Sequence, residues 1–210
     1  MRFFAVTAAR YFVVLLLFTF ATSATAHDIA TPVQRSTPLQ RREVNVPIKD
    51  FVLVDQNDRA FDFQRLRGKV VVVTFGYTTC PDICPLTTAA LRQLQDGLRP
   101  EERSRVYVLM MTTDPEVDSP AVLAGYAKRY NVDLSTWSFL TGDPAALASV
   151  WKRFGVMVQR RARGLIDHTS LTALVDGRGV MRYVYYGAAP DTQMVGKDLR
   201  TLLHGVSSTR

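Results

Sequence analysis

The sequence predicts an α/β fold, because strand-like and helix-like segments alternate along most of its 210 residues. Residues 69–77 form a continuous β-branched and aromatic run, which is typical of a strand buried on both faces of a sheet, and the apolar run within 105–112 predicts a second buried strand. Each is followed by a segment with helical spacing of apolar residues. With 47% hydrophobic residues and a mean hydropathy of +0.01, the composition is that of a globular domain and excludes a polytopic membrane protein.

The first 26 residues have the pattern of a secretory signal peptide. Arg2 and Arg10 supply positive charge, residues 11–20 form an almost wholly apolar block, and an Ala24-x-Ala26 ending predicts cleavage after Ala26. The apolar block is shorter than the ~20 residues that a membrane span needs, so an uncleaved anchor is the weaker alternative. We therefore expect an exported, periplasmic protein, anchored to the inner membrane only if the leader stays uncleaved.

Residues 27–46 are predicted to be a flexible tether, because they contain two prolines and no periodic apolar pattern. A folded domain is expected over 47–204, followed by a tail over 205–210. The domain should begin with a β-hairpin, since 51–54 and 60–63 flank a short polar turn.

The remaining segments continue the alternation of strands and helices. In chain order, we expect a helix from Pro85, a helix over 121–130, a short strand over 137–140, a helix opened by Asp143-Pro144, a hairpin of 170–175 and 180–186 around Asp176-Gly177-Arg178-Gly179, and a last helix over 191–204. This order predicts a sheet of the thioredoxin type with an N-terminal β-hairpin extension, although it also suits other α/β folds.

The two cysteines, Cys80 and Cys84, lie where the strand over 69–77 gives way to a helix. Disulfides stabilise exported proteins mainly by closing long loops, and a pair four residues apart closes almost none. The pair is therefore interpreted as a redox dithiol or as two thiolate ligands of a metal ion, with buried, inert cysteines as the remaining alternative. Free N–H groups at the start of the helix would stabilise a thiolate, whereas Asp82 opposes one unless it turns away to cap the helix.

Among the three histidines, His168 is the candidate third ligand. It lies in Asp167-His168-Thr169-Ser170 just before a predicted strand, whereas His204 is near the C-terminus. His27 could bind copper only if cleavage made it the N-terminal residue. Two thiolates and one imidazole form a soft site that suits Cu(I), with zinc as the competitor. Composition alone does not bring His168 near Cys80.

Other polar and charged residues are given structural roles. Asp114 and Asp118 follow the strand over 105–112 and are interpreted as turn and capping residues. Met110 and Met111 lie inside that strand, so one of them is expected to pack in the core, with a thioether metal ligand as the weaker alternative. The net charge of +7 is scattered among 19 acidic residues, which excludes a nucleic-acid stripe and indicates a solvated basic surface suited to an acidic partner protein.

Four motifs in this order resemble the Sco/SenC family, the thioredoxin-fold copper-delivery proteins of cytochrome c oxidase assembly, over residues 47–204. They are residues 74–85 (TFGYTTCPDICP), Thr113-Asp114-Pro115 through Pro120, residues 137–142 (WSFLTG) and residues 167–170 (DHTS). The resemblance implies that Cys80, Cys84 and His168 bind one copper ion, Cu(I) or Cu(II). It also implies delivery of copper to the binuclear copper centre of oxidase subunit II, with another copper chaperone as a candidate donor.

Two functions of different kinds remain open. A copper chaperone is not an enzyme and passes its ion on by ligand exchange. A thiol–disulfide oxidoreductase would instead keep the copper-ligand cysteines of the partner reduced. A peroxidase is a weaker third hypothesis. His168 separates the first two, because a reductase has no obligate need for it.

Overall fold

The computed structural model describes residues 40–187 and 189–207. The predicted signal peptide over 1–26, His27 and the first part of the predicted tether lie outside these residues. Within the described ranges, no helix combines the length and the apolar character that crossing a membrane requires.

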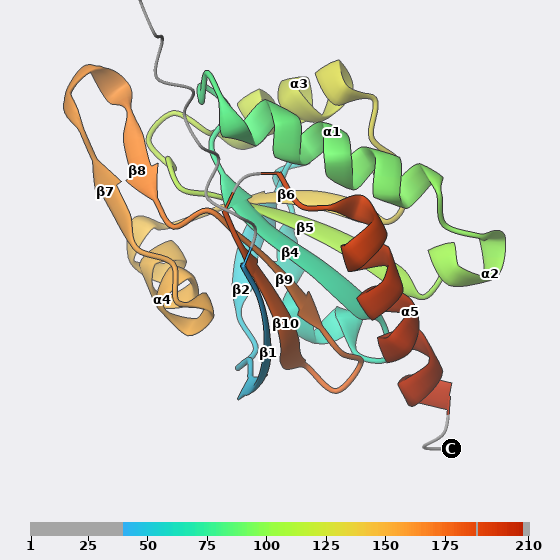
Figure 1. Cartoon of the computed structure of the whole chain (residues 1–210). Helices are drawn as coiled ribbons and strands as arrows, with labels where there is room; N and C mark the ends of the chain where they lie inside the picture. The colour runs from blue at the N-terminus through green and yellow to red at the C-terminus, as the bar shows by residue number, and fades with distance from the viewer. Residues whose placement is uncertain (1–39, 188, 208–210) are drawn as a thin grey trace, which may run out of the picture. The chain divides into compact units, whose positions relative to one another are not determined.

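In the described part of the chain, an eight-stranded sheet has the order β1-β10-β9-β4-β5-β6-β2-β3 (Figure 1). Its strands are β1 (Gln40–Pro47), β2 (Val52–Asp55), β3 (Ala60–Asp62), β4 (Val70–Gly76), β5 (Val106–Thr112), β6 (Trp137–Thr141), β9 (Leu171–Val175) and β10 (Val180–Tyr186). The three strands β4, β5 and β6 are parallel, and the other neighbours are antiparallel. Every residue of β4, β5, β6 and β9 is buried, as their uninterrupted apolar sequences predict.

Helices cover both faces of the sheet, so the sheet lies between two hydrophobic cores. The helices are α1 (Ile83–Asp96), α2 (Pro100–Arg103), α3 (Pro120–Tyr130), α4 (Pro144–Phe154) and α5 (Thr192–Ser207), and η1 (Phe63–Leu66) and η2 (Ala162–Gly164) are short 3-10 turns. Helices α1, α3 and α5 pack on the face of β4 that presents Val70 and Val72, whereas α4 packs on the face that presents Val71 and Val73. The prediction of an α/β sheet of the thioredoxin type is confirmed, as is the β2–β3 hairpin.

The tether prediction is wrong for residues 40–46, which form most of β1 and pair antiparallel with β10. The sequence does not identify β1 because this edge strand leaves most of its side chains accessible. Its apolar alternation is limited to Val44 and Val46, which is too short to predict a strand. Arg41 fastens β1 to the domain by donating hydrogen bonds to Asp198 of α5 at 2.6 and 3.0 Å. The hydroxyl of Tyr185 also donates to that carboxylate, at 2.6 Å.

Outside the main sheet, β7 (Val158–Arg160) and β8 (Ile166–His168) form a separate two-stranded sheet that projects from the domain (Figure 1). The sequence predicts no strand at β7, and it predicts that His168 precedes a strand, whereas His168 is the last residue of β8. Three-residue strands are too short for alternation to identify them.

The anchoring of β1 gives a testable prediction. Arg41→Ala removes hydrogen bonds to a charged, largely buried carboxylate, so we expect the free energy of unfolding to fall by about 1.5–3 kcal/mol. Arg92→Ala is the control, because its ion pair with Asp96 is exposed, and exposed pairs contribute only about 0.2–1 kcal/mol. Urea denaturation measures both variants. Equal losses in the two would contradict the anchoring role of Arg41.

Candidate metal centre

The candidate centre lies where β4 ends and α1 begins. Cys84 lies in the first turn of α1, and Cys80 lies in the preceding loop, as the sequence predicts. Both are free thiols, with exposed fractions of 8% for Cys80 and 3% for Cys84. They pack with Tyr77 and Ile166 in one small apolar cluster. Residues of two distant segments, the β4–α1 connection and β8, therefore meet around the sulfur atoms.

Gly76, the last residue of β4, makes room for the Cys84 sulfur. A Cβ atom at this position would lie 2.9 Å from Sγ of Cys84 and 3.1 Å from Cε of Met110. Any side chain here would displace the thiol, so the glycine sets how closely the sulfur approaches the sheet. Met110 and Met111 both lie in the hydrophobic cores, whereas the sequence predicts a core position for only one of them.

The two sulfur atoms lie in contrasting electrostatic environments. A hydrogen bond from the Cys84 thiol, together with the backbone N–H groups of residues 82–84, lowers the pKa of Cys80 in spite of its burial. The same thiol–thiolate hydrogen bond, reinforced by burial, raises the pKa of Cys84. Cys80 is therefore the thiolate of the pair, and Cys84 is the thiol that donates to it.

Asp82 does not interfere with this thiolate. It occupies the N-cap position of α1 and is exposed, and its side chain makes no capping hydrogen bond to the described residues. The suggestion that Asp82 caps the helix is therefore wrong. The first N–H groups of α1 remain directed at Cys80 instead.

His168 ends β8 and lies next to the thiol pair. Its ring makes an edge-on contact with Tyr77, with ring centroids 6.2 Å apart, and His168 and Cys84 line the same small cavity. Nδ1 lies 3.1 Å from the carbonyl oxygen of Thr169. Burial lowers the pKa of His168, so its imidazole is neutral at pH 7, which is the form that binds metals.

The three candidate ligands are neighbours without forming a closed metal site. Among the described residues, no three His, Cys, Asp or Glu side chains are placed so that they could hold a metal ion together. His168 would have to approach the sulfur atoms of Cys80 and Cys84 more closely for all three to bind one ion.

The turn role predicted for the acidic residues after β5 is confirmed at Asp114, whose carbonyl oxygen accepts from the N–H of Asp118 at 2.9 Å, but their side chains have other roles. Asp118 is fully buried and accepts hydrogen bonds from the backbone N–H and hydroxyl of Thr78 and from the hydroxyl of Thr112. Burial raises the pKa of Asp118. Its carboxylate thus ties the loop that carries Cys80 to the end of β5. The prediction of a capping role is wrong, since Ser119 caps α3.

Asp114 is also buried, with 1% of its surface exposed, and its carboxylate accepts a hydrogen bond from Arg160 of β7. The same guanidinium lies 3.2 Å from the carboxylate of Glu116. Sequence reasoning missed Thr78 and Arg160, whose partners are distant along the chain. One signal in the sequence could have indicated a functional role for this segment: a cluster of acidic residues follows a buried strand, and functional side chains commonly lie at the carboxyl ends of parallel strands.

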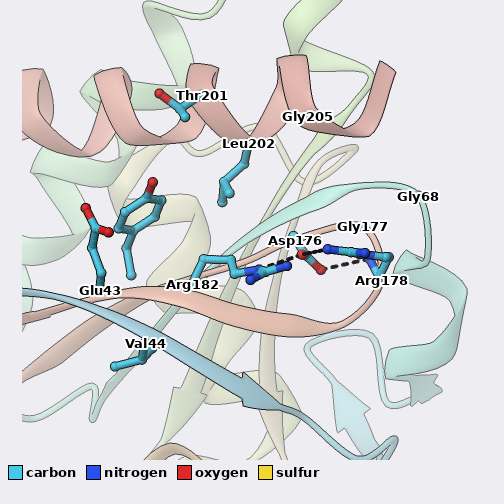
Figure 2. A pocket seen from close by; sticks show the side chains of 11 residues that line it. Glu43, Val44, Gly68, Asp176, Gly177, Arg178, Arg182, Thr201, Leu202 and Gly205 are labelled. Atoms are coloured by element: carbon cyan, nitrogen blue, oxygen red, sulfur yellow. Dashed lines mark hydrogen bonds and ion pairs between the residues drawn. The ribbon is translucent and has the colours of Figure 1, made fainter. Parts of the chain in front are cut away.

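A cavity of about 710 Å³ lies elsewhere, between α5 and the β9–β10 hairpin (Figure 2). Asp176, Arg178 and Arg182 line it, and the Nε of Arg182 donates to Asp176 at 2.8 Å. The cavity lies at the turn of that hairpin, whereas His168 precedes its opposite end. It is therefore separate from the thiol pair.

A family model described as SCO1/SenC matches residues 40–204. The chain belongs to the SCO1/SenC family. This SCO1/SenC protein is 30% identical over 160 residues to an SCO2-like protein of Rickettsia conorii, covering 72% of this chain and 76% of the relative.

Two solved structures also resemble this SCO1/SenC protein. The structure of Bradyrhizobium japonicum ScoI with copper bound shares 29% identity, covers 75% of this chain and 99% of that one, and gives a TM-score of 0.64. BsSco, a member of the Sco family of cytochrome c oxidase assembly proteins in which a disulfide switch was identified, shares 26% identity, covers 80% and 98%, and gives a TM-score of 0.68.

The lowered pKa of Cys80 predicts a pH dependence. In the reduced protein, Cys80 should react with iodoacetamide faster than Cys84 at pH 7. The alkylation rate of Cys80 should fall only when the pH is well below the ordinary thiol pKa of about 8.5. Cys84→Ala removes the largest contribution to the shift, so the midpoint for Cys80 should rise. Alkylation rates mapped by mass spectrometry measure this. A native midpoint at or above the ordinary value would contradict the assignment of the thiolate.

Proposed function

We propose that this SCO1/SenC protein binds one copper ion through Cys80, Cys84 and His168 and delivers it to the binuclear copper centre of cytochrome c oxidase subunit II during assembly. One observation carries the proposal: two free thiols and a neutral imidazole, from segments more than 80 residues apart in sequence, meet at one end of the sheet. Family membership, the copper-bound ScoI relative and the oxidase-assembly relative BsSco support it.

The donor set fits copper better than a hard cation. Thiolate sulfur and imidazole nitrogen are soft to intermediate ligands that favour Cu(I) over Mg²⁺ or Ca²⁺. Cys80 is already a thiolate, and His168 is neutral, so at neutral pH only the Cys84 proton has to leave on binding. With three ligands the ion retains room for an incoming ligand, which is what transfer by ligand exchange requires.

The thiol environment also favours a second candidate, a thiol–disulfide oxidoreductase. The Cys80 thiolate would attack a partner disulfide, form a mixed disulfide and release one partner thiolate. Cys84 would then lose its proton to solvent and displace the second partner thiolate. The products are a Cys80–Cys84 disulfide and a reduced partner, so the two electrons come from this protein. The low-pKa Cys80 beside Cys84 is the observation that supports this activity.

We place the protein in the periplasm, after export directed by residues 1–26. This assignment rests on the leader-like sequence, which lies outside the described residues. Another copper chaperone is the donor that this location and the soft ligand set suggest.

Oxidase assembly at limiting copper distinguishes the two functions. If delivery is the function, oxidase assembly should fail in all three ligand variants, His168→Ala, Cys80→Ser and Cys84→Ser. Loss of a residue that hydrogen-bonds to a metal ligand already weakens metal binding ~10- to 100-fold, and loss of the ligand itself should weaken it at least as much. Added copper should partly restore assembly. If thiol reduction is the function, the two cysteine variants alone should fail.

His204→Ala is the matched control, because this histidine is exposed near the end of α5 and distant in sequence from the centre. It should support assembly at the native level. Normal assembly at limiting copper with His168→Ala, together with failure of Cys80→Ser, would overturn the delivery function in favour of the reductase.

A further inference from the structure

We propose that Arg160 is a positioning residue for copper binding: its ion pair with the buried Asp114 holds the β7–β8 hairpin against the domain and so keeps His168 beside the two cysteines. This inference rests on the proposed function, since it concerns the placement of the third ligand. It adds a residue of β7 whose ion-pair partners are Asp114 and Glu116.

The hairpin forms a unit of its own. The strands β7 and β8 pair only with each other in the described sheets, with Arg160 opposite Ile166 and Val158 opposite His168. Arg160 and His168 therefore lie on the same small sheet, separated by one rung of the ladder. A contact that holds Arg160 against the domain places His168 as well.

The anchor on the domain side is a buried carboxylate. Asp114 is 1% exposed, and its Oδ2 atom is buried with no hydrogen-bond partner among the described residues. A buried charge is costly unless it is paired, and Arg160 is the cation that the structure pairs with it. The backbone N–H of Asp114 donates to the hydroxyl of Thr112 at 2.8 Å, which fixes the anchor to the end of β5.

Ile166, the register partner of Arg160 on β8, is attached to the cluster that contains the two cysteines. The backbone N–H of Ile166 donates to the Tyr77 hydroxyl at 3.3 Å, and the Ile166 side chain packs with Cys80 and Cys84. The pair of Arg160 and Ile166 is therefore held at both ends, by an ion pair at one and by apolar contacts at the other. Without the ion pair, β7 keeps the contacts of Val158 with the hydrophobic clusters but loses the charged contact that holds Arg160.

The loop that supplies Asp114 also holds the cysteines. Asp118, four residues later, binds Thr78, which lies two residues before Cys80. One segment after β5 thus positions both parts of the site, the thiol loop through Asp118 and the histidine hairpin through Asp114. This shared origin explains why two carboxylates are buried in so short a segment.

The test measures Cu(I) affinity by anaerobic competition with a chromophoric Cu(I) chelator. We expect the double variant Arg160→Gln/Asp114→Asn, which leaves no unpaired buried charge, to bind Cu(I) about 10- to 100-fold more weakly than the native protein. Arg160→Lys keeps a positive charge but loses the planar guanidinium, so it should show an intermediate loss. Arg161→Gln is the matched control, since its ion pair with Asp167 is exposed, and it should bind copper as the native protein does.

Repeating the Cu(I) affinity measurement in a His168→Ala background shows whether Arg160 acts through His168 or only stabilises the fold. If Arg160 acts through His168, the double substitution should cause no further loss there, because the ligand that it positions is absent. Native affinity in the double variant, or an equal fold-loss in both backgrounds, would overturn this inference alone. Failure of the native protein to bind Cu(I) would overturn the proposed function and this inference with it.

Discussion

The buried carboxylate of Asp118 is the interaction on which the geometry of the site depends. It accepts hydrogen bonds from Thr78, next to the cysteine loop, and from Thr112 at the end of β5. A buried charge is tolerated only when such donors surround it, so the loop is held against the sheet in one position. The first turn of α1 can then direct its N–H groups at Cys80, and the Cys84 sulfur can lie against Gly76.

The parallel pairing of β4 and β5 makes this contact geometrically available. Gly76 and Thr112 are register partners, so both strands end at the same level. The segments that follow them, one with the two cysteines and the other with Asp114 and Asp118, therefore leave the sheet side by side. This edge is the location at which α/β sheets commonly place functional side chains. The hairpin that carries His168 completes the arrangement from a third segment.

How well the sequence predicts each element depends on how far apart along the chain its interacting residues lie. The strands β4 and β5 and the helix that begins at Asp143-Pro144 are predictable, because burial and capping leave local patterns. The edge strand β1 is not, since it depends on pairing with β10 and on the contact between Arg41 and Asp198. Likewise, the cysteine pair is evident from its spacing, whereas the roles of Asp114 and Asp118 depend on partners about 40 residues away.

We infer that two thiolates and one imidazole share a single copper ion in this protein. X-ray absorption at the copper edge, on the reduced protein loaded with one equivalent of Cu(I), tests it most directly because it reports the atoms bound to the metal. We expect two sulfur neighbours and one nitrogen neighbour at the copper ion, with the nitrogen absent in His168→Ala. A spectrum with sulfur neighbours alone, or one unchanged by His168→Ala, would contradict it.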